Sequence, residues 1–288
     1  MTPDKGSILI TGASSGIGRT CALMLDRAGY QVFAGVRTLQ ALEELSSLAP
    51  GRIRPVMLDI TDAILIRSAC QTIDLRLEGK GLTALINNAG ITLPGSVEFL
   101  SLEGFRRELE VNVIGHLAVT QAFLPWIRKG KGRIINVGSA LGKFVMPLTG
   151  AYAASKFALE ALTDSLRREL LPSGIYVSLV APGSVESAIW DKIDAEVAQM
   201  EAGLTEEANA RYGRTGESIS NLWKKAHRRA IPPEAVAEVV LKILESSRPE
   251  SRYPVGPDAH FLSIVGRFAP DSLVDWVVDK IVTLSRGR

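Results

Sequence analysis

The sequence SILITGASSGIG occupies residues 7–18 and joins a short apolar run to an amphipathic helical pattern that follows from Arg19. An apolar run, three glycines and then a helical pattern predict a buried strand, a tight turn and the N-terminus of a helix. At such a turn, free backbone N–H groups and the positive end of the helix dipole face one point, which suits a pyrophosphate. The spacing is GxxxGxG and differs from the GxGxxG dinucleotide fingerprint. A glycine turn without a ligand is the structural alternative.

Short β-rich runs alternate with longer helical patterns beyond this turn. Amphipathic stretches such as Arg19–Ala28 and Phe105–Arg128 separate the apolar runs. The predicted strands are Ser7–Thr11, Val32–Val36, Arg54–Leu58, Ala84–Asn87, Arg133–Val137 and Tyr176–Ala181. Parallel strands need crossover connections and are covered on both faces. The order therefore predicts an α/β protein with a doubly wound parallel sheet, in one domain that spans residues 1–288.

A change in composition after Ala181 predicts an additional helical element over the sheet. Pro182–Gly183 ends the last predicted strand, and a polar segment rich in Glu and Arg follows from about Asp191 to Arg229. Its apolar residues recur at helical spacing and are Trp190, Ile193, Val197, Met200 and Leu204. We expect residues 186–230 to form a helical lid over a substrate pocket; an ordinary packing helix is the alternative.

The C-terminal region, residues 257–288, is expected to be a helical extension because the stretch from Phe261 to Leu284 is amphipathic. It is a docking helix, a dimer contact or a shallow membrane anchor. Asp275, Asp279 and Lys280 interrupt its apolar run, which is shorter than the roughly 20 residues needed to cross a bilayer. The sequence therefore predicts no transmembrane segment.

The composition argues against several function classes. The chain has 288 residues and a formal net charge of +2, which is too small to indicate the clustered basic surface of a nucleic-acid-binding protein. Cys21 and Cys70 lie in helical patterns without the spacing or the His neighbours of a zinc or redox site. The N-terminus lacks a basic segment followed by an apolar stretch and a cleavage site. We expect a cytoplasmic protein with no nucleic-acid partner and no bound metal.

The end of the second predicted strand indicates which nucleotide the turn would bind. An Asp or Glu at this point would accept hydrogen bonds from the ribose hydroxyls of NAD(H), but Val36 and Arg37 stand there instead. A guanidinium suits a 2′-phosphate in charge and in its fork of donors. A solvated arginine is the alternative. We predict NADP(H) as the cofactor, with NAD(H) as the less favoured choice.

Polar residues also follow the third and fourth predicted strands. Asp59 can accept a hydrogen bond from an adenine amino group, and the stretch Asn87–Gly90 can steady the sheet edge and the cofactor. Ligands of open parallel sheets bind at the carboxyl ends of the strands. These positions therefore support the nucleotide site that the glycine turn predicts.

A tyrosine and a lysine lie one helical turn apart after the fifth predicted strand. Ser139 follows that strand, and the run YAASK places Tyr152 and Lys156 at i and i+4 on the same helix face. An ammonium and a nicotinamide cation both favour the phenolate, which makes Tyr152 a general acid/base. Ser139 would bond the substrate oxygen, and Asn112 would hold a water that leads from Lys156 to solvent. A surface tyrosine and lysine without function is the alternative.

The order of these motifs resembles the short-chain dehydrogenase/reductase family. The motifs occur in the same order as in that family: TGASSGIG, NNAG, the helix with Asn112, Ser139 and YAASK. The resemblance covers the chain to about Tyr253. The stretch VFAGVR, the helix from YAASK onward and the long C-terminal tail look most like the branch of 17β-hydroxysteroid and retinol dehydrogenases and their bacterial relatives. The resemblance implies a doubly wound Rossmann fold, with Asn112, Ser139, Tyr152 and Lys156 as the catalytic tetrad.

The resemblance also implies which residues contact the cofactor. Ser187 stands where many family members have Thr, a change that keeps the hydroxyl group. The expected cofactor-binding residues are Gly12, Ser14, Ser15, Gly16, Ile17, Gly18, Arg37, Asp59, Ile60, Asn87, Asn88, Ala89, Gly90, Tyr152, Lys156, Pro182, Gly183, Val185 and Ser187.

The expected function is an NADP(H)-dependent oxidoreductase that interconverts an alcohol and a ketone or aldehyde. The apolar residues after Ser139 and the branch resemblance favour a bulky hydrophobic substrate, steroid-, retinoid- or lipid-like. The expected substrate residues are Ser139, Leu141, Met146, Tyr152 and Trp190. The alternatives are a non-catalytic NADP(H)-binding sensor or scaffold, and an epimerase or dehydratase on the same fold.

By the same resemblance, we expect a homodimer or homotetramer that pairs through the helices of Asn112 and Tyr152. The cytoplasmic location leaves peripheral membrane association through the C-terminal helix as an open alternative.

Overall fold

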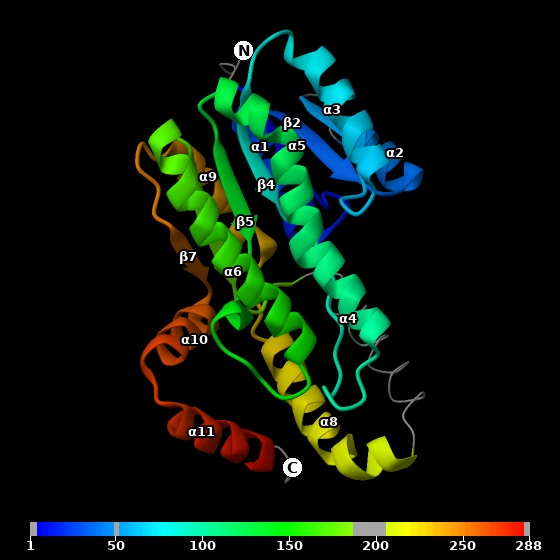
Figure 1. Cartoon of the computed structure of the whole chain (residues 1–288), viewed down its shortest axis with the longest axis vertical. Coiled ribbons are helices and arrows are strands. Elements are labelled where there is room, and N and C mark those ends of the chain that lie inside the picture. Colours follow the sequence, from blue (N-terminus) through cyan, green and yellow to red (C-terminus); the bar gives the residue numbers. More distant parts are fainter. Residues whose placement is uncertain (1–4, 49–51, 187–205, 285–288) are drawn as a thin grey trace.

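The computed structural model describes residues 5–48, 52–186 and 206–284, which form a seven-stranded parallel sheet flanked by helices (Figure 1). The strand order is β3-β2-β1-β4-β5-β6-β7. The strands are β1 Ser7–Ile10, β2 Gln31–Val36, β3 Ile53–Met57, β4 Leu82–Asn87, β5 Arg133–Val137, β6 Tyr176–Pro182 and β7 Arg252–Val255. The prediction of a single-domain, doubly wound parallel sheet is confirmed.

The strands are buried on both faces, which explains why their sequences read as continuous apolar runs. In β1, Ile8 and Ile10 belong to one hydrophobic core, and Leu9 between them belongs to the other. Successive side chains of a strand point to opposite faces. The sheet therefore separates two cores, each covered by its own layer of helices.

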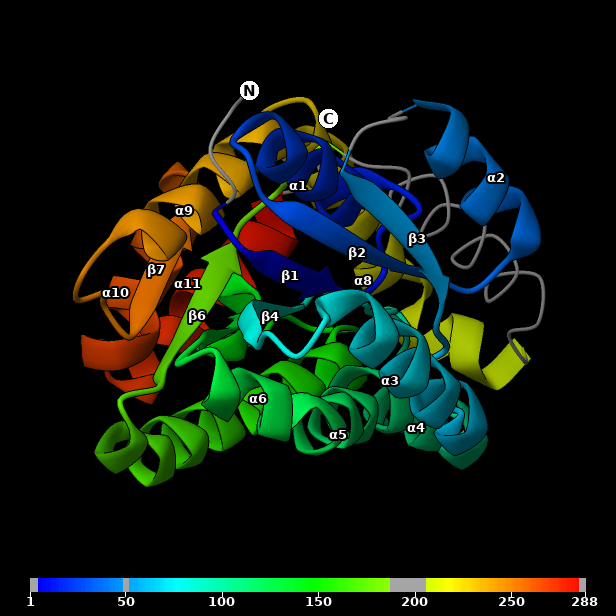
Figure 2. The same ribbon diagram turned by 90° about the horizontal axis from the view of Figure 1, so that it is seen from above.

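The two helical layers are visible when the sheet is seen from above (Figure 2). One layer holds α1 Gly16–Arg27, α2 Leu39–Leu48 and α9 Pro233–Glu245. The other holds α3 Ala63–Leu77, α5 His116–Lys129 and α6 Gly150–Leu170. This arrangement is the expected result of parallel crossovers that wind in both directions from the first strand.

One strand escaped the sequence prediction. β7 has only four residues, contains Pro254 and pairs only with β6, at the edge of the sheet. Proline lacks the N–H that a central ladder requires and is tolerated at an edge. A short segment with a proline gives a weak strand signal, so the C-terminal edge of the sheet was not predicted.

The long helix that the sequence predicts over Phe105–Arg128 is interrupted. It consists of α4 Leu102–Leu109, a π-helical segment Glu110–Gly115 and α5. A π-helical turn places an extra residue in the helix and frequently marks a functional site. Here the segment contains Asn112, whose side chain is completely buried.

The remaining helices lie after β6. α8 spans Glu206–His227 within the predicted lid, and the extension forms α10 Pro257–Phe268 and α11 Asp271–Leu284. α10 lies against the short helix Ala140–Gly142, and α11 lies against α8. The earlier part of the predicted lid, residues 187–205, is outside the described residues, and so are Ser187 and Trp190.

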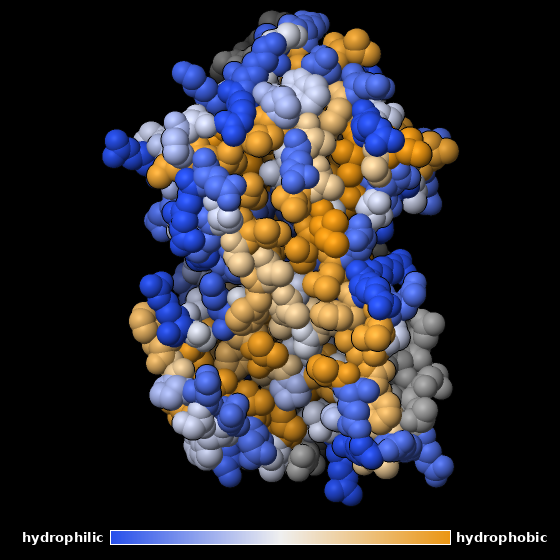
Figure 3. Space-filling model, in the orientation of Figure 1, coloured by the Kyte–Doolittle hydropathy of each residue, from blue (hydrophilic) through white to orange (hydrophobic). Residues whose placement is uncertain are grey.

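Apolar side chains gather along the middle of the face that α5 and α6 form (Figure 3). Of the apolar residues of these elements and of the π-helical segment before α5, Ile114 of that segment and Phe157 of α6 are 49% and 42% exposed. Among the described helices, none is both long enough and apolar enough to cross a membrane.

Candidate active site

The segments that the sequence singles out meet at one edge of the sheet. The strand order reverses between β1 and β4, and open parallel sheets bind ligands outside the carboxyl ends of the strands at such a switch point. The glycine turn follows β1, the NNAG turn follows β4, Ser139 follows β5 and Gly183 follows β6. The fold therefore brings all four motifs to one side of the molecule.

The glycine turn packs so closely against itself and the NNAG turn that Gly12 and Gly18 have no room for a side chain. Gly12 has a φ of +65°, and a Cβ there would lie 2.8 Å from Ala89 Cα. A Cβ on Gly18 would overlap the carbonyl oxygen of Gly12. The N-cap residue of α1, Ser15, makes no side-chain capping bond. The first N–H groups of α1 are thus left for an anion, and the turn fits a pyrophosphate.

The NNAG turn is tied to the glycine turn. Thr11 Oγ1 accepts hydrogen bonds from Asn88 N at 2.9 Å and Ala89 N at 3.1 Å, and Asn88 Nδ2 donates to Gly12 O at 3.1 Å. These bonds fix the two turns as one unit, so the cofactor would meet a prearranged surface.

Asn87, the first residue of this motif, faces the interior. Its Nδ2 donates to Thr120 Oγ1 and to Asn136 Oδ1, both at 2.9 Å. The side chain is 1% exposed. Asn87 therefore serves the packing of β4 against β5 and α5, and it does not face the cofactor side of the sheet edge as the sequence led us to expect.

The carboxyl ends of β2 and β3 carry the residues expected around the adenosine. Arg37 is exposed directly after β2, and within the described part of the chain its guanidinium forms no ion pair. Asp59 Oδ1 accepts bonds from Thr61 N at 2.9 Å and Thr61 Oγ1 at 2.7 Å, while Ile60 is buried. Arg37 is thus available to an anionic group, whereas Asp59 already shapes its own loop.

Ser139, Tyr152 and Lys156 converge between β5 and α6. Tyr152 and Ser139 share a side-chain hydrogen bond. Lys156 Nζ donates to Val137 O at 3.2 Å and lies 5.5 Å from the centroid of the Tyr152 ring. A hydroxyl, a phenol and an ammonium group therefore face one point at the sheet edge, an arrangement suited to proton transfer.

Burial sets the proton affinities of this group. It raises the pKa of Tyr152 to about 12; the bond with Ser139 opposes this shift and the charge of Glu108 adds to it. Burial lowers the pKa of Lys156 to about 8, against the effect of Glu108. The sequence argument expected the lysine charge to favour the phenolate, but desolvation of the charged form prevails in the protein without cofactor. Tyr152 therefore holds its proton at neutral pH, as an acid must.

Asn112 is bonded to protein groups through both ends of its amide. Its Oδ1 accepts from Ile91 N at 2.9 Å, and its Nδ2 donates to Ile91 O at 2.9 Å and to Ser155 Oγ at 3.0 Å. A Cβ on Gly90 would lie 3.3 Å from Asn112 Oδ1 and 3.9 Å from Lys156 Nζ. Gly90 thus lies between the two side chains that the predicted water would join.

The segment after β6 is held by the C-terminal region. Gly183 N donates to Val255 O at 2.9 Å, and Ser184 N donates to Asp258 Oδ2 at 2.7 Å. Val185 is buried and pairs with Ile231 in an isolated bridge. Sequence reasoning missed Asp258, because nothing in its local pattern connects it to a loop more than seventy residues earlier.

The residues expected to contact substrate are only partly described. Leu141 and Met146 are half-buried in the loop after Ser139. The same loop contains Leu148 at a φ of +64°, and Leu148 O accepts from Gly95 N at 2.9 Å. This bond joins the loop to the segment that follows the NNAG turn.

Two buried polar residues near this site were not predicted. Glu108 and His116 are 0% and 2% exposed, and each lies four residues from Asn112. That spacing, which puts the three on one helix face, was the available signal.

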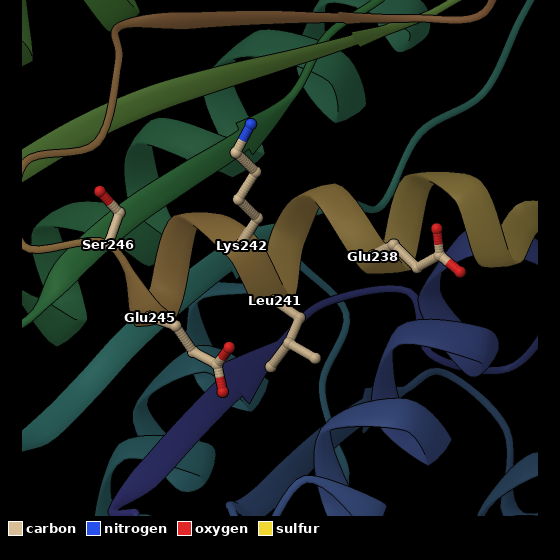
Figure 4. A pocket seen from close by; sticks show the side chains of 5 residues that line it. All are labelled: Glu238, Leu241, Lys242, Glu245 and Ser246. Atoms are coloured by element: carbon tan, nitrogen blue, oxygen red, sulfur yellow. The ribbon is translucent and has the colours of Figure 1, made fainter.

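A separate depression of about 410 Å³ lies on α9 (Figure 4). Its lining residues are Glu238, Leu241, Lys242, Glu245 and Ser246. Glu245 pairs with Lys5 at 2.7 Å, just before β1 begins. The depression is therefore near the amino end of β1, at the opposite end of the sheet from the motifs. Across the described ranges, no three His, Cys, Asp or Glu side chains gather in a way that would hold a metal ion.

Comparison with known proteins gives a consistent result. A family described as short chain dehydrogenase matches residues 7–198. Retinol dehydrogenase 5 of Mus musculus is 34% identical over 284 residues, which cover 96% of this chain and 88% of that protein. A 3-amino-tetrahydro-pyrrolizinone reductase of Xenorhabdus hominickii is 38% identical over 256 residues, 88% of each chain.

A solved structure supports the same assignment. The short chain dehydrogenase of Burkholderia cenocepacia J2315 in complex with NADP superposes with a TM-score of 0.72 at 26% identity. The match covers 94% of this chain and 96% of that chain.

Proposed function

This chain belongs to the short chain dehydrogenase family and is an oxidoreductase; from that premise we propose that it exchanges hydride between NADP(H) and a bulky hydrophobic alcohol or carbonyl compound. The observation that carries the proposal is the convergence of Ser139, Tyr152 and Lys156 beside a glycine turn on the same sheet edge. The three side chains suit proton transfer to and from an oxygen atom, and the glycine turn suits the pyrophosphate of a dinucleotide.

The roles of the residues follow from their chemistry. The nicotinamide supplies or accepts the hydride when it is bound. Ser139 orients the substrate oxygen by a hydrogen bond, and Tyr152 donates a proton to that oxygen during reduction or removes it during oxidation. Lys156 places its charge beside the phenol, and Asn112, whose amide is fixed by Ile91 and Ser155, would hold a water that leads from Lys156 to solvent.

The preference for NADP(H) rests on Arg37. It is exposed at the end of β2, where no carboxylate stands to bond the ribose hydroxyls. The related structure from Burkholderia cenocepacia, which contains NADP, supports the same choice.

The proposed substrate class rests on the character of the side chains after Ser139 and on the names of relatives. Leu141 and Met146 present apolar groups after Ser139, and one relative is named as a retinol dehydrogenase. The bacterial relative is named for a smaller heterocyclic substrate. A substrate panel must therefore span both sizes.

Assembly and location are part of the proposal. The apolar face of α5 and α6, with Phe157 exposed on α6 and Ile114 exposed in the π-helical segment before α5, supports a homodimer or homotetramer. A single monomeric species across a wide concentration range in sedimentation would refute the proposed oligomer.

We also propose a cytoplasmic location. The alternative is contact with a membrane surface, which three exposed apolar side chains of α10 favour: Phe261, Ile264 and Phe268 are 63%, 62% and 73% exposed. Co-sedimentation with liposomes tests this alternative.

The experiment that tests the function is NADPH oxidation with a panel of ketones and aldehydes, from small diketones to steroids and retinal. Wild-type protein is compared with Tyr152→Phe and with Tyr176→Phe, a control at the amino end of β6. Turnover that Tyr152→Phe lowers by about 10²- to 10⁴-fold, with the control unchanged, supports the proposal. NADPH binding without turnover favours a sensor, and turnover without net cofactor oxidation favours an epimerase or dehydratase.

A further inference from the structure

Three buried polar side chains follow one another at intervals of four residues along α4, the π-helical segment and α5. They are Glu108, Asn112 and His116, and they are 0%, 0% and 2% exposed. A buried polar side chain is costly unless it is hydrogen-bonded. The proposed chemistry gives a role to Asn112 but none to Glu108 or His116, so these two need another explanation.

All three side chains bond to the backbone of one segment, Ala89–Leu93, in reverse order. Leu93 N donates to Glu108 Oε1 at 3.2 Å. Ile91 N donates to Asn112 Oδ1 and Ile91 O accepts from Asn112 Nδ2, both at 2.9 Å. His116 Nε2 lies 2.6 Å from Ala89 O, and because a carbonyl only accepts, Nε2 carries the hydrogen.

The intervals on the two sides correspond. The partners are four residues apart along the helical elements, at 108, 112 and 116, and two residues apart along the segment, at 93, 91 and 89. Each fourth helical position therefore meets every second residue of the segment. These bonds hold the chain in place beyond the end of β4.

The segment held in this way runs along the proposed reaction site. At one end, Ala89 N donates to Thr11 Oγ1, and Ala89 lies against Gly12 of the glycine turn. Gly90 lies between Asn112 and Lys156. A shift of the segment would therefore move the cofactor side and the lysine side of the site together.

Glu108 and His116 also interact electrostatically with the residues of this site. Glu108 raises the pKa of Lys156 and of Tyr152, although burial has the larger effect on each. Burial, helped by the charge of Lys156, lowers the pKa of His116 to about 4. His116 is therefore neutral at neutral pH, and the hydrogen on its Nε2 is the one donated to Ala89 O.

We propose that Glu108 and His116 are positioning residues of the reaction, which act with Asn112 as a ladder that fixes the register of Ala89–Leu93 beside the cofactor and Lys156. The inference rests on the proposed function for its effect on catalysis, and on the contacts alone for the ladder itself.

The test compares paired variants at each end of the ladder. Glu108→Gln keeps an acceptor for Leu93 N, whereas Glu108→Leu removes it; His116→Gln keeps an N–H donor for Ala89 O, whereas His116→Leu removes it. Glu103→Leu, an exposed position on the same helix α4, is the control. The measurements are amide hydrogen exchange of residues 89–93, NADPH affinity and the separate values of kcat and KM.

The ladder predicts different losses at its two ends. Glu108→Leu should speed exchange of the Leu93 amide and lower kcat, each by about tenfold. His116→Leu should weaken NADPH binding by about tenfold, because Ala89 borders the glycine turn. The glutamine variants should recover most of each loss, and Glu103→Leu should match the wild type.

Two results would overturn the proposal. One is unchanged exchange and unchanged NADPH affinity in both leucine variants. The other is a lower melting temperature with kcat, KM and NADPH affinity as in the wild type, which describes a purely structural role. Absence of turnover in the wild type would count against the proposed function alone, because exchange and NADPH affinity still judge the ladder.

Discussion

Lys156 Nζ lies 5.5 Å from the centroid of the Tyr152 ring and is held there by a hydrogen bond to Val137 O. The two side chains are one turn apart on α6 and both are buried enough to change their proton affinity. The pKa of Lys156 is lowered to about 8 and that of Tyr152 is raised to about 12. Each shift therefore favours the neutral form of its group, and Lys156 is the one of the two whose charge is lost just above neutral pH.

This relationship predicts the pH dependence of reduction. Reduction needs a proton on Tyr152 and a charge on Lys156. Because the pKa of Lys156 is lowered to about 8, both conditions hold below pH 8 and the second fails above it. We expect kcat/KM for reduction to be constant below about pH 8 and to fall above it, and oxidation to rise with pH. Lys129→Gln, at the exposed end of α5, should leave the profile unchanged, and a flat wild-type profile to pH 10 would refute the assignment.

Arg37 is predicted to set the choice between the two nicotinamide cofactors. Arg37→Gln removes a charge-assisted bond to the 2′-phosphate, and such bonds are worth about 1.5–3 kcal/mol. We expect NADPH affinity to fall by roughly 10- to 100-fold while NADH affinity changes little, as measured by fluorescence titration. The control is Arg27→Gln, at the C-terminus of α1 and thus at the end of this helix away from the glycine turn. Equal losses for both cofactors would show that Arg37 does not read the phosphate.

Alanine substitutions at Gly18, in the glycine turn, and at Gly216, in α8, test whether the turn requires a residue without a side chain. A Cβ on Gly18 would overlap Gly12 O and lie 2.5 Å from Asn88 Nδ2, whereas a Cβ on Gly216 in α8 would meet nothing within 4 Å. Gly18→Ala should abolish measurable NADPH binding. Gly216→Ala should raise the free energy of unfolding by about 0.4–1 kcal/mol. Isothermal titration and urea denaturation check the two outcomes, and wild-type NADPH affinity in Gly18→Ala would contradict the close approach.

His116 predicts a loss of stability in mild acid. Its pKa is about 4 in the folded protein and 6.5 in the reference state. Between these values the unfolded chain binds the extra proton, so stability is lost as the pH falls below 6.5. The free energy of unfolding should fall by about 2 kcal/mol between pH 7.5 and pH 5 on account of this residue.

Urea titrations of the wild type and of His116→Gln at both pH values measure this term. Carboxylates titrate in the same pH range in both proteins. The contribution of His116 is therefore the loss of unfolding free energy in the wild type between pH 7.5 and pH 5 minus the same loss in His116→Gln. Identical losses would mean that His116 accepts a proton in the folded state.

The sequence predicted most strands to within two residues because buried parallel strands leave continuous apolar runs between helical patterns. It predicted the meeting of the glycine turn, Ser139 and YAASK because parallel strands bring their carboxyl ends together. Side-chain direction was harder to predict: Asn87 lies in a motif expected to face the cofactor, yet its amide bonds to Thr120 and Asn136 in the interior.

The π-helical segment could not be predicted from local pattern, and the four-residue spacing of Glu108, Asn112 and His116 gave no indication that all three are buried. An extra residue in a helical turn leaves no composition signal, and Glu108 beside Arg106 and Arg107 reads like an ordinary solvated helix face. Its burial depends on the segment after β4, which approaches from elsewhere in the fold. Tertiary structure therefore decides which polar residues of this helix are buried.

The bond between Asp258 and Ser184 has a consequence for how the protein is made. A chain leaves the ribosome from its N-terminus, so the glycine turn and Tyr152 emerge long before Asp258. The loop that Ser184 begins can gain its Asp258 partner, and Gly183 its Val255 partner, only after β7 and the first turn of α10 have been synthesised. A nascent chain that ends before β7 thus carries the glycine turn, Ser139 and Tyr152 but lacks the two bonds that hold the segment after β6.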